Sequence, residues 1–183
     1  MDAATSESAE LAVMSSLLDL EEFELVHWGQ DRAKRLRTFT VVPKQSVGLC
    51  PHCRRVSGER HVCRDRTVMD LPMGGWRTEL VVRLWQYRCP ACDRFFTPGF
   101  AALAEGAHAT ERLLERLEEL IARSDVCAAA RFFGIAEKTA EKWYYQHRKH
   151  KQERPPQPAL EPIRSLGIDE LSLKKDTGSS AAC

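Results

Sequence analysis

The chain has 183 residues, of which 43% are hydrophobic and 29% charged, which is typical of one or two small globular domains. No run of 18 apolar residues occurs, and the acidic N-terminus lacks the basic start of a secretory signal, so a cytoplasmic protein without a membrane span is expected. The net charge of +1 hides an asymmetry. Residues 1–30 carry seven acidic side chains and no Lys or Arg, whereas the rest carries 27 basic against 19 acidic ones, a net charge of +8. A basic body of this kind favours a polyanionic partner.

The first 43 residues predict a leader followed by a hairpin. Residues 1–22 are acidic and are expected to be partly disordered or to form a short helix, for which residues 11–20 are sufficiently apolar. The segments FELVHW (23–28) and LRTFTVVP (36–43) are typical of strands, and the polar GQDRAK between them favours a turn. An antiparallel β-hairpin is therefore predicted.

Two copies of one motif follow, CPHC at 50–53 and CPAC at 89–92. Each Cys-x-x-Cys turn places two thiolates on one side of a tight loop, and two facing loops complete a tetrahedral site for structural Zn²⁺. The total of seven cysteines is odd, which agrees with metal binding better than with disulfides. The predicted ligands are Cys50, Cys53, Cys89 and Cys92.

The four cysteines also admit other assignments. The four residues could be buried free thiols or two redox pairs, and His52 or His61 could replace a ligand, although four thiolates already complete a closed site. The remaining cysteines are assigned no metal role: Cys63, Cys127 and Cys183.

The residues between the two motifs predict a long hairpin. The strand-like segments 61–72 and 77–88 are joined by MGGW, whose glycines permit a tight turn. The layout is that of a zinc ribbon with an extended hairpin, and the whole unit is expected over residues 23–100. Arginines interleave with aromatic residues here, which is compatible with nucleic-acid contact or, equally, with an aromatic core and solvated basic faces. The candidate DNA-binding residues are Arg64, Arg66 and Arg83.

From Thr110 onward the apolar residues recur with a helical period, and Thr110 and Asp125 are suited to begin helices. Small residues, a turn glycine at Gly134 and flanking apolar residues then follow in the order of a helix-turn-helix, expected over residues 108–150. The recognition helix would be 137–148; the alternative is a three-helix bundle with a charged face. The predicted base-facing residues are Lys138, Thr139, Lys142, Tyr145 and Gln146, and the predicted phosphate-facing residues are Arg148, Lys149 and Lys151.

Taken in order, the hairpin, CPHC, VRLWQYRCPAC, the helical segment and GIDE (167–170) resemble the N-terminal portion of bacterial insertion-sequence transposases of the ISL-three type. In that family a zinc ribbon and a helix-turn-helix bind the terminal inverted repeats, and an RNase-H-like core with a DDE carboxylate triad follows. The resemblance covers about residues 20–175, and Asp169 matches the first triad carboxylate. It implies double-stranded DNA as a partner, with a second copy of the chain or a full-length transposase as protein partners.

The chain departs from this family after Lys175, where DTGSSAAC stands in place of further core strands. A proline-rich linker (151–163) and the start of a truncated core (164–183) are therefore expected. On the expected strand, Glu170 would lie on the opposite face from Asp169, so an incomplete triad and no Mg²⁺ site are expected in this chain alone.

These observations predict an α+β fold: a β-hairpin and zinc ribbon, then a three-helix helix-turn-helix domain, a linker and one orphan strand of an RNase-H-like core. The function that follows is non-enzymatic, sequence-specific DNA binding, associated with the bacterial nucleoid. One alternative is part of an active transposase completed by a missing segment or partner chain. Another is a zinc-ribbon module that binds protein or RNA.

Overall fold

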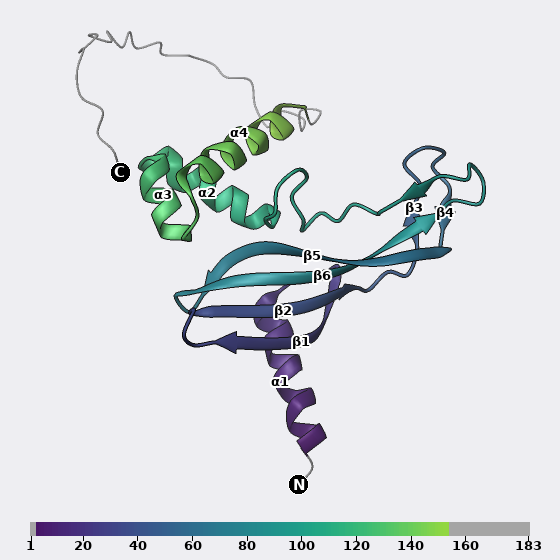
Figure 1. Cartoon of the computed structure of the whole chain (residues 1–183), viewed down its shortest axis with the longest axis horizontal. Helices are drawn as coiled ribbons and strands as arrows, with labels where there is room; N and C mark the ends of the chain where they lie inside the picture. Colours follow the sequence, from purple (N-terminus) through teal and green to yellow (C-terminus); the bar gives the residue numbers. More distant parts are fainter. Residues whose placement is uncertain (1–2, 154–183) are drawn as a thin grey trace, which may run out of the picture.

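The computed structural model describes residues 3–153, which form a sheet, a ribbon at one end of it and a group of three helices (Figure 1). The predicted α+β class is confirmed. The elements are α1 (Ala3–Leu18), β1 (Phe23–Asp31), β2 (Leu36–Pro43), β3 (Gly48–Leu49), β4 (Val56–Ser57), β5 (Arg60–Met73), β6 (Trp76–Arg88), β7 (Phe95–Phe96), α2 (Glu111–Arg123), α3 (Val126–Phe133) and α4 (Glu137–Glu153).

Both predicted hairpins are present and join into one sheet with the strand order β1-β2-β6-β5. β1 and β2 are antiparallel, as are β5 and β6, whose connecting Gly74 and Gly75 have φ of +61° and +74°. Glycine adopts such angles without steric cost. The two hairpins meet through a parallel pairing of β2 with β6, from Leu36 opposite Arg77 to Val41 opposite Val82, which the sequence did not predict.

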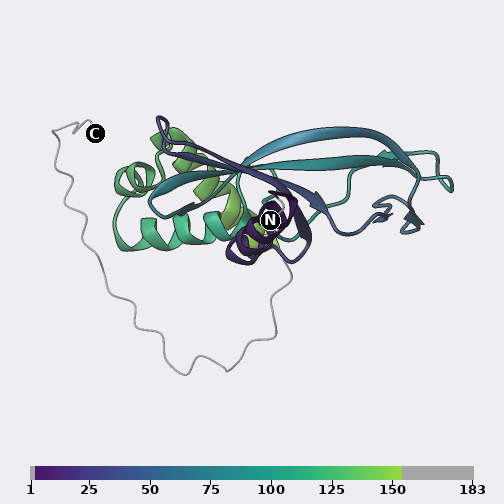
Figure 2. The same cartoon turned by 90° about the horizontal axis from the view of Figure 1, so that it is seen from below.

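One face of this sheet carries the larger apolar core. Alternate residues of β2, β5 and β6 are almost completely buried on it, as period-2 patterning requires: Phe39, Val41, Val68, Leu80 and Val82. Leu18 of α1 and the partly buried Phe100 and Leu103 complete the cluster. Figure 2 shows the sheet nearly edge-on with α1 on one side of it. Helix α1 begins at Ala3, earlier than the 11–20 segment expected to be helical.

The three predicted helices α2, α3 and α4 pack against one another around a second core. Thr110 and Asp125 are the N-caps: the Thr110 hydroxyl accepts from the Leu113 N–H and the Asp125 carboxylate from the Ala128 N–H. Helix α3 ends at Phe133 and is capped by Gly134, which has φ of +65°. The core of this group consists chiefly of Leu113, Leu117, Ala129, Phe133, Ala140 and Trp143, and Met69 of β5 joins it.

Helix α4 continues to Glu153 and so includes the first residues of the expected linker. The rest of the linker, the expected orphan strand, Asp169 and Cys183 lie outside the described residues. Within residues 3–153, no helix is long and apolar enough to cross a membrane.

Candidate metal centre and nucleic-acid interface

The two Cys-Pro-x-Cys motifs form matching turns at the far end of the β5–β6 hairpin. In the first turn the Cys50 N–H donates to the Arg55 carbonyl at 2.8 Å and its carbonyl accepts from the Arg54 N–H at 2.9 Å. The second turn repeats this pattern, with Cys89 donating to Arg94 at 2.8 Å and accepting from Asp93 at 2.8 Å. The residue after each second cysteine has positive φ, +60° at Arg54 and +55° at Asp93. The sequence repeat is therefore a repeat of backbone structure.

These turns bring the four predicted ligands together. The Sγ atoms of Cys50, Cys53, Cys89 and Cys92 all lie within 4.8 Å of one another. The Cys50 and Cys92 sulfurs are 3.7 Å apart, and those of Cys53 and Cys89 are 3.4 Å apart. A tetrahedral site with Zn–S bonds of about 2.3 Å needs sulfur atoms about 3.8 Å apart. The cluster thus fits structural zinc, and within the described residues no other group of Cys, His, Asp and Glu side chains converges in this way.

The protonation of the thiols also fits a cation. Burial acts to raise the pKa of Cys89, but the N–H groups of Cys92 and Ala91 and the Cys53 thiol donate to its sulfur and lower the pKa to about 7. Burial, together with the neighbouring sulfurs, raises the pKa of Cys92 to about 12. Four thiolates therefore need a positive charge among them, which Zn²⁺ would supply.

A small core supports the metal turns. Tyr87 and Phe96 are buried beside Cys50 and Cys89, with their rings stacked 5.9 Å apart between centroids. The Ser57 hydroxyl donates to the Arg88 carbonyl at 2.5 Å and so ties β4 to β6. Of the two histidines that could replace a ligand, His52 contacts Arg94 and His61 lies against Phe95.

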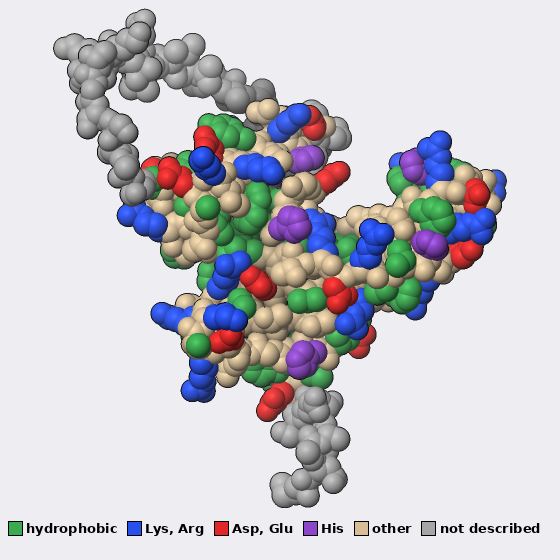
Figure 3. Space-filling model, in the orientation of Figure 1, with side chains coloured by type: hydrophobic (Ala, Val, Ile, Leu, Met, Phe, Trp, Pro, Cys, Tyr) green, Lys and Arg blue, Asp and Glu red, His purple; other side chains and the backbone are tan. Residues whose placement is uncertain are grey.

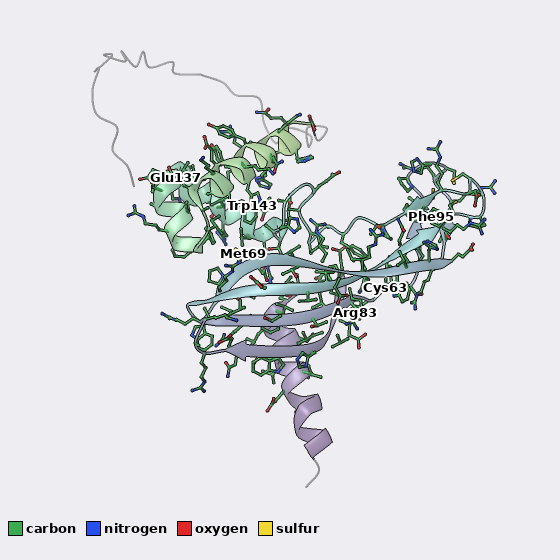
Figure 4. All side chains as sticks on the ribbon, viewed as in Figure 1. Cys63, Met69, Arg83, Phe95, Glu137 and Trp143 are labelled. Carbon is green, nitrogen blue, oxygen red and sulfur yellow. The ribbon has the colours of Figure 1, made fainter. Side chains whose placement is uncertain are left out.

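The predicted recognition helix α4 presents a stripe of exposed side chains. Lys138, Lys142, Tyr145 and Lys149 follow the helical spacing and are all exposed, Tyr145 at 63% of its surface. The opposite face of α4 is buried through Ala140, Trp143 and His147. Figure 4 shows Trp143 directed toward the neighbouring helices and the sheet.

Three other predicted residues of α4 are half-buried or already engaged in a contact within the protein. Thr139 is half-buried and lines a hollow between the start of α4 and β5. Gln146 is also half-buried, and its Oε1 has no hydrogen-bond partner among the described residues. Arg148 is exposed but donates to the Tyr144 hydroxyl at 2.9 Å and lies over that ring.

The three candidate arginines of the long hairpin do not share a surface. Strand register places Arg64 and Arg66 on the same face of the sheet as Val68, whereas Arg83 lies on the opposite face. Arg83 is paired there with Asp65 of β5, with its Nε 3.2 Å from the Asp65 Oδ1. Arg66 donates to the Ala104 and Ala107 carbonyls at 3.3 and 2.6 Å. Its guanidinium therefore fixes the loop before α2 and is occupied within the protein.

Sequence reasoning missed the contacts that orient α4. The buried His147 has Nδ1 3.1 Å from Glu118 and Nε2 3.4 Å from Glu111, both on α2, although neither contact has hydrogen-bond geometry. Lys151 donates to Glu118 at 2.8 Å, and this bond holds the pKa of Glu118 below its usual range. The sequence did contain one signal that His147 is buried: it follows Trp143 by four residues and therefore lies on the same, apolar face of the helix.

Two matching Cys-Pro-x-Cys turns closing a β-hairpin over one four-sulfur site define a zinc-ribbon protein. Residues 46–92 match the family described as the zinc-finger of transposase IS204/IS1001/IS1096/IS1165. The chain is also 31% identical over 157 residues to the transposase for insertion sequence element IS1001 of Bordetella parapertussis. Residues 46–92 therefore match the zinc ribbon of these transposases in sequence and in the geometry of the four cysteines, and the chain is similar to an insertion-sequence transposase over most of its length.

The alignment with the IS1001 transposase covers 83% of this chain and 36% of the relative, so the chain spans little more than a third of that protein. No solved structure matches the chain significantly.

Proposed function

We propose that this chain is the DNA-recognition part of an insertion-sequence transposase and binds the terminal inverted repeats of its element. The observation that carries the proposal is the exposed stripe Lys138, Lys142, Tyr145 and Lys149 on α4. Three basic residues and a tyrosine along one helix face supply both phosphate contacts and hydrogen bonds to base edges.

The connection between α3 and α4 supports this reading. The αL conformation of Gly134 reverses the chain within three residues, and the Ile135 N–H donates to the Ala130 carbonyl at 3.0 Å. Two helices joined by such a short turn, the second with an exposed basic face, have the form of a helix-turn-helix. We infer that α4 enters the major groove while its buried face stays on α2 and α3.

The long hairpin would extend the DNA contact toward the zinc ribbon. Arg83 shares a face of the sheet with Met69, which packs into the helical core, so Arg83 lies on a surface leading from α4 to the ribbon (Figure 4). Figure 3 shows Lys and Arg side chains over both the helices and the ribbon on this side of the molecule. Arg64 lies on the other face and is the weaker candidate.

The described structure does not include Asp169, the residue that matches the first catalytic carboxylate, so catalysis is considered separately from DNA binding. The relative is a transposase of which this chain spans 36%. We propose that this chain recognises DNA ends without cutting them and that strand transfer requires a complete DDE core. Incubation with an end-containing duplex and Mg²⁺ or Mn²⁺ tests this. Metal-dependent nicking that is lost in Asp169→Ala would instead support an active transposase.

The binding proposal is tested with labelled duplexes taken from the two ends of the element that carries this gene. We expect these duplexes to bind more tightly than scrambled duplexes, and RNA of the same sequence to bind weakly. Equal binding of end and scrambled DNA would contradict sequence-specific recognition. Preference for RNA would support the alternative RNA-binding module.

A further inference from the structure

A cavity of about 230 Å³ lies where the β5–β6 hairpin leaves the main sheet and approaches the ribbon. It is bounded by the end of β2, the segment after it and the ribbon half of the hairpin. The lining residues are Val42, Pro43, Gln45, Arg60, Arg83, Trp85 and Tyr87. None of them is acidic and none is a predicted zinc ligand, although Tyr87 and Trp85 also pack in the small core beside the metal turns.

The chemistry of the lining is that of an aromatic and apolar floor with a basic rim. Trp85 is half-buried, so part of its indole remains accessible, and Val42 and Pro43 lie beside it. The Arg60 guanidinium is exposed and lies 5.1 Å from the centre of the Trp85 ring. Arg83 enters from the other side, and its Nε donates to Asp65 at 3.2 Å.

We propose that this cavity binds one unpaired nucleotide of a DNA strand. A base would stack on the accessible part of the Trp85 indole beside Arg60, and the adjoining phosphates would pair with the Arg60 and Arg83 guanidinium groups. The Gln45 amide at the rim offers hydrogen bonds to a base edge. Bases within a duplex are stacked on their neighbours, so only a single-stranded base can enter a concave pocket of this kind.

The position of the cavity connects it with the proposed DNA contact of α4. Trp85 and Arg83 project from the sheet face that also carries Met69, and Met69 packs against the helical group. The inference rests on the proposed function only in that the strand would belong to the DNA held by α4. A strand leaving that duplex would cross the open sheet face toward the ribbon.

The test uses the full chain with zinc bound and compares a blunt end duplex with the same duplex carrying a short single-stranded thymidine extension. We expect the extension to tighten binding at least about fivefold, the low end of what stacking of a base on an aromatic side chain contributes. Arg60→Gln and Trp85→Leu should remove this gain and leave affinity for the blunt duplex almost unchanged, while Trp85→Phe should keep part of it. Arg32→Gln removes the same charge at the far end of the sheet and should retain the full gain.

A second readout separates this inference from the proposed function. Tryptophan fluorescence is measured on titration with single-stranded oligothymidine alone and with thymidine monophosphate. Quenching by the oligomer that Arg60→Gln weakens supports the pocket even if no duplex binds. Equal affinity for blunt and extended duplexes, or gains that survive both Arg60→Gln and Trp85→Leu, would overturn it. Equal binding of the mononucleotide and the oligomer would also overturn it, because the site would then recognise a free nucleotide.

Discussion

Arg112 of α2 donates two hydrogen bonds to the carboxylate of Asp70 in β5, one of them from Nε to Oδ1 at 2.8 Å. Asp70 is 1% exposed and also accepts from the Thr110 hydroxyl at 2.7 Å. This bond to Asp70 raises the pKa of Arg112. The Met69 N–H donates to the His108 carbonyl beside it. The pair therefore fixes the start of the helical group against the sheet and sets where α4 lies relative to the ribbon.

Replacing Arg112 with Gln should destabilise the protein by about 3–5 kcal/mol, because the buried Asp70 charge would lose its partner. Urea unfolding followed by circular dichroism measures this change. Arg116→Gln is the matched control, since Arg116 pairs with Glu119 on the exposed surface of the same helix. Its cost should be below about 1 kcal/mol. Similar costs for the two variants would show that Asp70 and Arg112 do not act as a buried pair.

Cys89→Ser should abolish zinc binding and unfold the ribbon, which includes β3, β4, β7 and the adjoining end of the hairpin. The group α2–α4 should persist because its core and its contact with Asp70 do not depend on the metal. Metal analysis together with amide exchange in the two regions checks this. Cys63→Ser, which alters a cysteine outside the cluster, should keep a full equivalent of zinc. Substoichiometric zinc in the freshly purified, reduced wild-type protein would contradict the assignment.

Zinc retention should fall with decreasing pH. The pKa of Cys89 is lowered to about 7 from an ordinary value of 9.0, so the stabilisation that depends on this thiolate is present at alkaline pH and is lost as pH falls through about 7. Protons then compete with the metal for the sulfurs. Zinc transfer to a chromogenic chelator, followed between about pH 8 and pH 6, should show this loss. A transfer profile that is flat over this range would contradict it.

Residues at different positions on α4 should make different kinds of DNA contact, to bases or to phosphates. Lys142→Ala should reduce discrimination between end and scrambled duplexes by about 1–3 kcal/mol if it removes a base contact. Lys149→Ala should weaken both duplexes equally and reduce the salt dependence of binding, as expected for a phosphate contact. Anisotropy titrations at several salt concentrations distinguish the two. Identical behaviour of both variants would mean that α4 does not lie in the groove as proposed.

The locally encoded features of this fold were predictable from the sequence. The Cys-Pro-x-Cys turns, the Gly74–Gly75 turn and the caps at Thr110 and Asp125 each depend on residues within a few positions. The parallel pairing of β2 with β6 depends on residues about 40 positions apart and has no local signature. The hydrogen bonds of Arg66 also have no local signature. The sequence identifies Arg66 as a basic residue but does not show that it donates to the Ala104 and Ala107 carbonyls.

The exposed face of α4 was predictable only in part. The helical period correctly separates Lys138, Lys142 and Tyr145 from the buried Trp143. The helical period does not predict how far residues at the border of the two faces are buried, because their burial depends on how the neighbouring helices pack. Gln146 is such a case, because its partial burial follows from packing around α4 rather than from its own position in the helix.

Selection of bound duplexes from a random DNA pool tests the central claim most directly. The wild-type chain should enrich one sequence, and that sequence should occur at both ends of the parent element. Enrichment should weaken in Lys142→Ala and persist in Arg32→Gln, which alters a residue of the β1–β2 turn. Failure to enrich any sequence, or the same enrichment with Lys142→Ala, would contradict recognition of DNA through α4.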